Sequence, residues 1–194
     1  MALVKKRLKK NKMFGKLLIF LLVVLLAFGI PGFFIITGVR EAASRGKSLV
    51  LAYEKQDFSL IKSEIRFTKN ALQKVNIPLT VLFWMKFIPF VGGYYQDAKS
   101  LAQGGVYELE AIEEIFSKLE PNKGELGFNG VSKSGPERIV QSIKLLEKSA
   151  PFLDNIESKV IKAADLVRNI DTGKYPQKFR GKDVRKNIDR KSVV

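Results

Sequence analysis

Cysteine and histidine are both absent from this chain of 194 residues. Their absence excludes disulfide bonds, cysteine nucleophiles, imidazole bases and nearly every common transition-metal site. The sequence also lacks a glycine-rich phosphate loop, a nucleotide-binding fingerprint and a credible nucleophile arrangement. We therefore expect a protein that is not an enzyme and that needs no cofactor or metal.

Acidic residues are scarce at both ends of the chain. The net charge is +15, but residues 1–16 hold seven basic and no acidic residues, and residues 171–194 hold eight basic and three acidic ones. The segment between them is left with a charge of only +3. Because the basic residues lie at the ends and not over a folded surface, nucleic acid is not the partner that we expect.

Charge is missing altogether from residues 17–39, LLIFLLVVLLAFGIPGFFIITGV. A helix of this length spans about 35 Å, enough to cross a hydrocarbon core of about 30 Å. The run is longer than that of a cleaved signal peptide and lacks a good cleavage site, so we expect an uncleaved anchor in a lipid bilayer. Pro31, between Gly29 and Gly32, predicts a plain kink.

The basic residues before this run predict its orientation, because positively charged segments stay in the cytoplasm. We expect residues 1–16 to form a basic cytoplasmic tail and the bulk of the chain to be extracytoplasmic. The residues concerned are Lys5, Lys6, Arg7, Lys9, Lys10, Lys12 and Lys16.

No later segment alternates apolar and polar residues as a strand would, whereas several repeat apolar or small residues at a spacing of three and four. We therefore expect an all-α protein, with a small extracytoplasmic helical bundle over residues 40–170 after the single transmembrane helix. Residues 39–53 continue the membrane helix. The three later stripes are Phe58, Ile61, Ile65, Thr68, Leu72 and Val75; Ala98, Ala102, Gly105, Leu109, Ile112, Phe116 and Leu119; and Ile139, Ile143, Leu146, Ala150, Leu153, Ile156, Val160, Ala163, Val167 and Ile170.

Proline and capping residues predict where these helices begin and end. Asp57 is expected to cap the first, Ile77-Pro78 to end it, and Pro121 to end the second. The third stripe keeps its register through Pro151, so it is either one kinked helix or two helices stacked in line. Residues 121–136 lack periodicity and predict a loop, and residues 171–194 predict a basic flexible tail.

Residues 77–95 admit three interpretations. The length suits a second transmembrane helix, but Lys86, Pro89 and the Gly92-Gly93 pair oppose it. An amphipathic segment in the membrane interface is the second interpretation, and a connector in the core between two helices is the third. The residues suited to the interface are Trp84, Lys86, Tyr94 and Tyr95.

The stretch IPFVGGYYQDAKSL, together with the basic start, the apolar run and the REAA and DFS segments, resembles the N-terminal part of the bacterial family catalogued as domain of unknown function 4012. The turn residues that carry the resemblance are Pro89, Val91, Gly92, Gly93 and Tyr94, with Val91 where the family usually has Leu. Members typically have a membrane anchor and helices rich in Ala and Leu, and they usually continue into a larger C-terminal domain. The resemblance implies an envelope protein that faces outward, present here either as its helical anchor module alone or as a truncated form, and it implies no reaction.

Three functions follow as expectations. The first is a non-catalytic, single-pass envelope protein whose helical domain acts as a scaffold or docking module, through a partner's helices or through self-association as a coiled coil. The second is binding of an anionic wall polymer or lipid headgroup by the tail. The tail residues that we expect to bind the anion are Lys178, Arg180, Lys182, Arg185 and Lys186.

The third function is that of an accessory subunit of an envelope lipid or glycan enzyme. Its candidate groups are the carboxylates of YELEAIEEIF, namely Glu108, Glu110, Glu113 and Glu114. Glu110 and Glu114 share a helical face, as general acid and base chemistry or a divalent cation would require. Such residues also form the solvated face of an ordinary helix.

Overall fold

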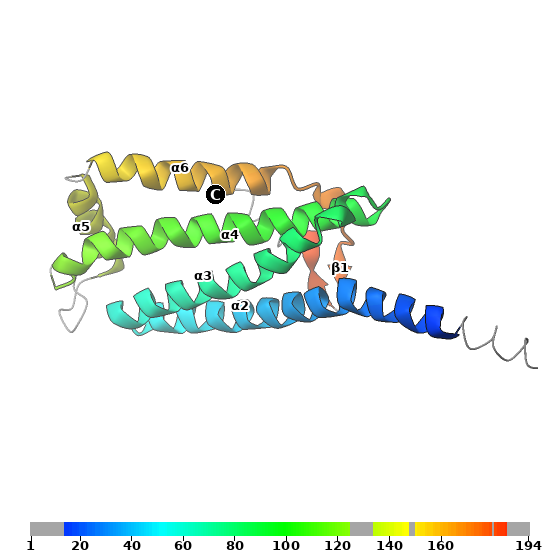
Figure 1. Ribbon diagram of the computed structural model, residues 1–194. Coiled ribbons are helices and arrows are strands. Elements are labelled where there is room, and N and C mark those ends of the chain that lie inside the picture. Colours follow the sequence, from blue (N-terminus) through cyan, green and yellow to red (C-terminus); the bar gives the residue numbers. More distant parts are fainter. Residues whose placement is uncertain (1–13, 125–133, 148–149, 180, 186–194) are drawn as a thin grey trace, which may run out of the picture.

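The computed structural model describes residues 14–124, 134–147, 150–179 and 181–185. Four long helices, α2, α3, α4 and α6, run side by side, each antiparallel to the one before it (Figure 1). Helix α2 packs on α3, α3 on α4, and α4 on α6. The helices are α2 (Ile30–Glu54), α3 (Phe58–Val81), α4 (Val91–Leu119), α5 (Gly135–Glu147) and α6 (Ala150–Arg168). The expected all-α fold is confirmed.

Shorter elements join and extend these helices. A two-residue hairpin near the C-terminus pairs β1 with β2, with Lys178 opposite Asp183. The short elements are the π-helical turn η1 (Leu25–Gly29), the 3-10 helices η2 (Phe83–Phe87), η3 (Glu120–Asn122) and η4 (Thr172–Lys174), and the strands β1 (Lys178–Phe179) and β2 (Lys182–Asp183).

The first helix is continuous from Phe14 to Glu54, and its N-terminal end protrudes beyond the rest of the bundle (Figure 1). It is long and apolar enough to cross a membrane, and residues 17–26 each leave between 38% and 65% of their surface exposed. The turn before Pro31 is π-helical. A wider turn relieves the clash between a proline ring and the preceding turn, so the chain accommodates Pro31 within a continuous helix.

Helix α3 begins as predicted and ends later than predicted. The side chain of Asp57 accepts a hydrogen bond of 2.9 Å from the Leu60 amide, which confirms the cap. The expected end at Ile77-Pro78 is wrong, because Pro78 lies inside the helix and the helix runs to Val81. Pro78 and Leu79 are both buried, and their packing outweighs the backbone hydrogen bond that proline removes.

The third predicted stripe divides into two helices. Helix α5 lies at one end of the molecule and is turned away from the axis of α6 (Figure 1), so the two are not stacked in line. Pro151 is the second residue of α6, where a proline costs no helical hydrogen bond. The predicted loop of residues 121–136 begins in η3 and ends in α5, and its residues 125–133 lie outside the described part.

The segment after α6 is not the flexible tail that the sequence predicts, as far as residues 171–179 and 181–185 describe it. It folds against the beginning of α4, where Tyr175 donates a hydrogen bond to Asp97 and Tyr94 donates one to the Lys174 carbonyl. Composition alone suggested disorder, because these contacts join residues about 80 positions apart.

The apolar stripes form the core of a single chain. One cluster, next to the apolar run of residues 17–39, is built from Val75, Leu79, Leu82, Tyr95 and Ala102, with Ile35 and Trp84 packed against it. A second, farther along the bundle, is built from Ala52, Ile61, Ile65 and Leu109. The bundle therefore uses the stripes of α3 and α4 internally, whereas Ile139 and Ile143 of the third stripe are exposed, and coiled-coil association stays a prediction.

Candidate membrane-contacting site

The chain that joins α3 to α4, residues 82–90, is called the tip. Within it, η2 is followed by Pro89 and by Phe90, whose backbone is left-handed with φ of 64°. Residues 77–95 thus contain the end of α3, a 3-10 turn and the start of α4, and they are not one helix. The second transmembrane helix that the sequence left open is therefore excluded by the fold.

The tip lies beside the apolar run. The ring of Trp84 meets that of Phe28 edge to face, with 4.9 Å between the ring centroids. Gly38 is buried against α3, where an added Cβ would come within 2.7 Å of Val75. Phe28 precedes Val39 by eleven residues, or about 16 Å of helix. The tip therefore reaches to about the middle of the run, and a boundary between anchor and bundle at residue 39 does not exist in the fold.

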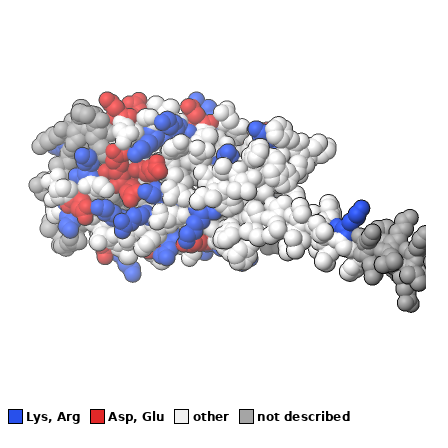
Figure 2. All heavy atoms as spheres, viewed as in Figure 1, with Lys and Arg blue, Asp and Glu red and all other residues white. Residues whose placement is uncertain are grey.

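On α2 and α3 charge stops at one level, although the folded tail brings Lys174 against Gly93 at the start of α4, where it pairs with Asp97. Lys74 of α3 pairs with Glu41 of α2, with its Nζ 3.0 and 3.1 Å from the two carboxylate oxygens. Beyond this pair, residues 75–96 contain one charged residue, Lys86, and residues 17–39 contain none. We call the Glu41–Lys74 pair the charge boundary. Figure 2 shows charged side chains over the rest of the bundle and, on the face in view, an almost uncharged surface over the tip end and the part of the first helix beside it.

Large apolar side chains cover the uncharged end. Five of them on α3 and the tip are more than half exposed: Ile77, Val81, Phe83, Phe87 and Phe90, the last at 95%. An exposed patch of this kind marks a contact with a membrane or another protein. The connector interpretation is right for the backbone, but these side chains do not fill the core.

Several backbone hydrogen bonds are made within the tip or next to it. The amides of Met85, Ile88 and Gly92 donate to carbonyls within or next to the tip at 2.9 to 3.1 Å, and Pro89 has no amide to satisfy. Backbone that enters hydrocarbon must pair its polar groups within the protein. The tip meets that requirement better than an open loop would.

The residues predicted for the membrane interface fall into different places. Lys86 is exposed, with its ammonium 4.7 Å from the centre of the Phe87 ring, and Trp84 is partly buried against Phe28. Tyr95 is only 6% exposed, and its hydroxyl donates to the Leu79 carbonyl, so its assignment to the interface is wrong.

The GGYYQD motif holds the folded tail. An added Cβ on Gly92 would lie 2.3 Å from the Lys86 carbonyl oxygen, so the close turn at the start of α4 requires glycine. The Tyr94 ring meets the Tyr175 ring at 5.4 Å. Burial and the hydrogen bond to Asp97 raise the pKa of Tyr175 to about 12.

The structure describes only some of the predicted anion-binding residues of the tail. Arg185 donates hydrogen bonds to the carbonyls of Tyr175 and Gly173, and Lys178 is exposed. Arg180 and Lys186 lie outside the described residues, as does the side chain of Lys182, and so do Lys5, Lys6, Arg7, Lys9, Lys10 and Lys12 of the N-terminus. Because Arg185 is engaged with backbone carbonyls, it serves the fold of the tail.

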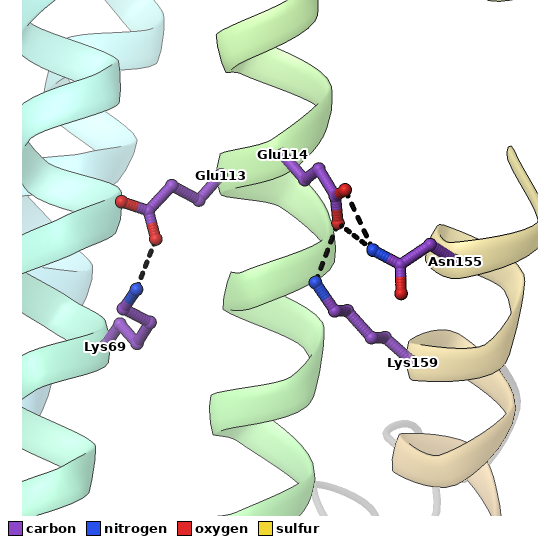
Figure 3. A network of polar contacts seen from close by, with 5 residues as sticks. All are labelled: Lys69, Glu113, Glu114, Asn155 and Lys159. Carbon is purple, nitrogen blue, oxygen red and sulfur yellow. Dashed lines mark hydrogen bonds and ion pairs between the residues drawn. The ribbon is translucent and has the colours of Figure 1, made fainter. Parts of the chain in front are cut away.

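The carboxylates of α4 join helices. Glu113 pairs with Lys69 of α3, whereas Glu114 accepts hydrogen bonds from Lys159 and Asn155 of α6 at 2.7 and 2.9 Å (Figure 3). The hydrogen bond from Lys159 lowers the pKa of Glu114, the opposite of what a general acid needs. Among the described residues, no group of three or more acidic side chains could hold a metal ion.

Comparison of the chain with family models, curated proteins and solved structures finds no match. The resemblance of the IPFVGGYY stretch to a bacterial membrane-protein family therefore stays a prediction. The geometry of the uncharged end is what indicates a function.

Proposed function

We propose that the chain is a non-catalytic, membrane-anchored docking module, held to the bilayer by its first helix and by the tip together. One observation carries the proposal: Trp84 contacts Phe28 about halfway along the apolar run. If the run spans the bilayer, the tip enters it as well. The charge boundary then lies at the level of the lipid headgroups.

The energy of insertion supports this arrangement. Fully burying a large apolar side chain is worth about 1.5–3 kcal/mol, so the five exposed ones contribute about 5 kcal/mol even at half that value. Against this stands Lys86, whose charge costs about 2.5–3.5 kcal/mol at the centre of a membrane and less when its long side chain reaches toward the headgroups. The balance favours an inserted tip.

The opposite end of the bundle provides a surface for a partner. Ile139, Val140 and Ile143 of α5, which lies at that end (Figure 1), are 50–60% exposed. We propose that these aliphatic side chains receive another envelope protein. The positive charge before the apolar run supports a location outside the cytoplasm.

The fluorescence of Trp84 tests the inserted tip, because it is the only tryptophan in the chain. The full chain is reconstituted in phosphatidylcholine vesicles whose acyl chains carry bromine near their middle. We expect strong quenching by the brominated chains and little quenching by aqueous iodide. The reverse pattern would mean that the tip is in water and would refute the proposal.

Cysteine labelling tests the orientation, because the chain has no cysteine of its own. Ser44 and Ser117 are exposed, near the charge boundary and toward the far end respectively. In intact bacterial cells, both Ser44→Cys and Ser117→Cys should react with a membrane-impermeant maleimide. Reaction only after lysis would place the bundle in the cytoplasm.

A further inference from the structure

An apolar groove of about 610 Å³ opens along the bundle. Ile35 and Val39 of α2 line one side, Ala98 and Gly105 of α4 line the other, and Leu72 belongs to the stripe of α3 that packs against both helices. Glu108 is the one charged residue among the described residues that line it. The volume is in the range of small-molecule sites, and the lining is that of an apolar ligand.

The groove begins at membrane depth and continues past it. Ile35 and Val39 belong to the apolar run, so this end is open to whatever surrounds that run. Leu72 and Gly105 lie on the other side of the charge boundary, nearer the middle of the bundle. From Ala98 to Leu109, which also lines the groove, α4 rises about 16 Å. The groove is thus a path from hydrocarbon to a site outside it.

The walls of the groove decide what kind of molecule fits. They are helices, whose backbone groups are paired within each helix, and no strand edge is among the residues that line it. An extended peptide would leave its own amides and carbonyls unpaired there, at a cost of about 1–3 kcal/mol each. A hydrocarbon chain has no such groups. A second helix, about 10 Å across, needs more room than the space between side chains provides.

We propose that this groove binds one acyl chain of a bilayer lipid, drawn out of the leaflet next to the tip. The inference rests on the proposed function, because the groove meets lipid only if the apolar run and the tip are inserted. It adds a ligand to that function: the docking module carries a lipid chain along α4, toward the end of the bundle that faces a partner.

Photo-crosslinking tests the proposal on the full chain. The protein is reconstituted in vesicles of phosphatidylethanolamine and phosphatidylglycerol that contain a phospholipid with a diazirine at the end of one acyl chain. Flotation first establishes that the protein is inserted. After irradiation, we expect crosslinked peptides at Leu72 and at residues 102–109, beyond the charge boundary, in addition to residues 17–36.

A pair of matched variants strengthens the test. Ala98 is exposed and lines the groove, so Ala98→Phe should fill it and reduce crosslinking at residues 102–109 at least threefold. Ala43 is exposed on α2 and does not line the groove, so Ala43→Phe should leave the crosslinks unchanged. If Ala98→Phe does not fold, as judged by circular dichroism, the crosslinks of the unchanged protein decide alone.

The outcomes distinguish failure of the groove proposal from failure of the membrane proposal. Crosslinks confined to residues 17–36 and the tip would overturn the groove proposal and leave the membrane proposal standing. Absence of lipid crosslinks in the groove of a protein that light scattering shows to be a dimer would overturn it in favour of a second copy as occupant. Failure to float would refute the membrane proposal, and the lipid site with it.

Discussion

A negative charge at Phe90 should drive the tip out of the membrane. Phe90→Asp removes a side chain that is 95% exposed and would gain about 1.5–3 kcal/mol on insertion. It also adds a negative charge, whose insertion at the centre of a membrane costs about 2.5–3.5 kcal/mol more. The sum, about 4–6 kcal/mol, matches the roughly 5 kcal/mol that the exposed side chains of the uncharged end supply. The inserted state should therefore lose its advantage.

The same substitution should not damage the fold. Phe90 has a φ of 64° and a ψ of −32°, and the Val91 amide donates a hydrogen bond to the Pro89 carbonyl across it, a γ-turn that is strained for phenylalanine and aspartate alike. The Phe90 side chain also leaves almost no packing behind. We expect the thermal unfolding midpoint in detergent to stay level. A loss of stability would show that Phe90 has a structural role that its exposure does not indicate.

Quenching of Trp84 measures the result. In vesicles with brominated acyl chains, Phe90→Asp should reduce quenching by the lipid and increase quenching by iodide. Val50→Asp is the control, because Val50 is also exposed on a helix, at 57%, but lies past the charge boundary. Equal quenching of the Phe90→Asp variant and the unchanged protein would refute the energy estimate for the tip.

Three further substitutions test the packing around the site. Gly92→Ala should destabilise the fold by about 1–3 kcal/mol, because its Cβ meets a backbone carbonyl, whereas Gly46→Ala, in open space within a helix, should stabilise it by about 0.5–1 kcal/mol; denaturant titration compares them. Glu114→Gln should lower the free energy of unfolding by about 1–2 kcal/mol. The unchanged protein should lose stability as pH falls through the lowered pKa of Glu114, and the variant should not show this loss. Glu108→Gln is the control and should show neither effect. The pKa of Tyr175 is higher in the folded tail than in an unfolded one, so the tail should lose stability as pH rises from about 10, the ordinary tyrosine pKa, toward 12. Tyr175→Phe should abolish this alkaline transition, as followed by circular dichroism.

The sequence predicts well what depends on neighbouring residues. The length and apolarity of residues 17–39 and the cap at Asp57 are local properties, and both appear in the structure. Proline is a weaker helix-ending signal than the local rule states, because Pro78 stays within α3, where buried neighbours compensate for its lost hydrogen bond. A local rule does not include that compensation.

The candidate site depends on pairs that the sequence does not reveal. Nothing in the one-dimensional pattern joins Trp84 to Phe28, or Tyr175 to Asp97, because each pair is fixed by how the antiparallel helices return. One signal was available. Residues 75–96 carry a single charge, and they follow a helix that must run antiparallel to the apolar run. An uncharged hairpin of this kind, next to a membrane helix, predicts insertion.

The helix from Phe14 to Glu54 has no flexible joint between the apolar run and the bundle. Inserted in the bilayer as proposed, it acts as a rigid arm that pivots within the membrane. From Phe28 to Glu54 the arm is about 39 Å long, so a change of 10° in the tilt of the membrane helix displaces the far end by about 7 Å. Tilt responds to bilayer thickness. The exposed aliphatic residues of α5, at that far end, would thus move toward or away from a neighbour as the membrane thins or thickens.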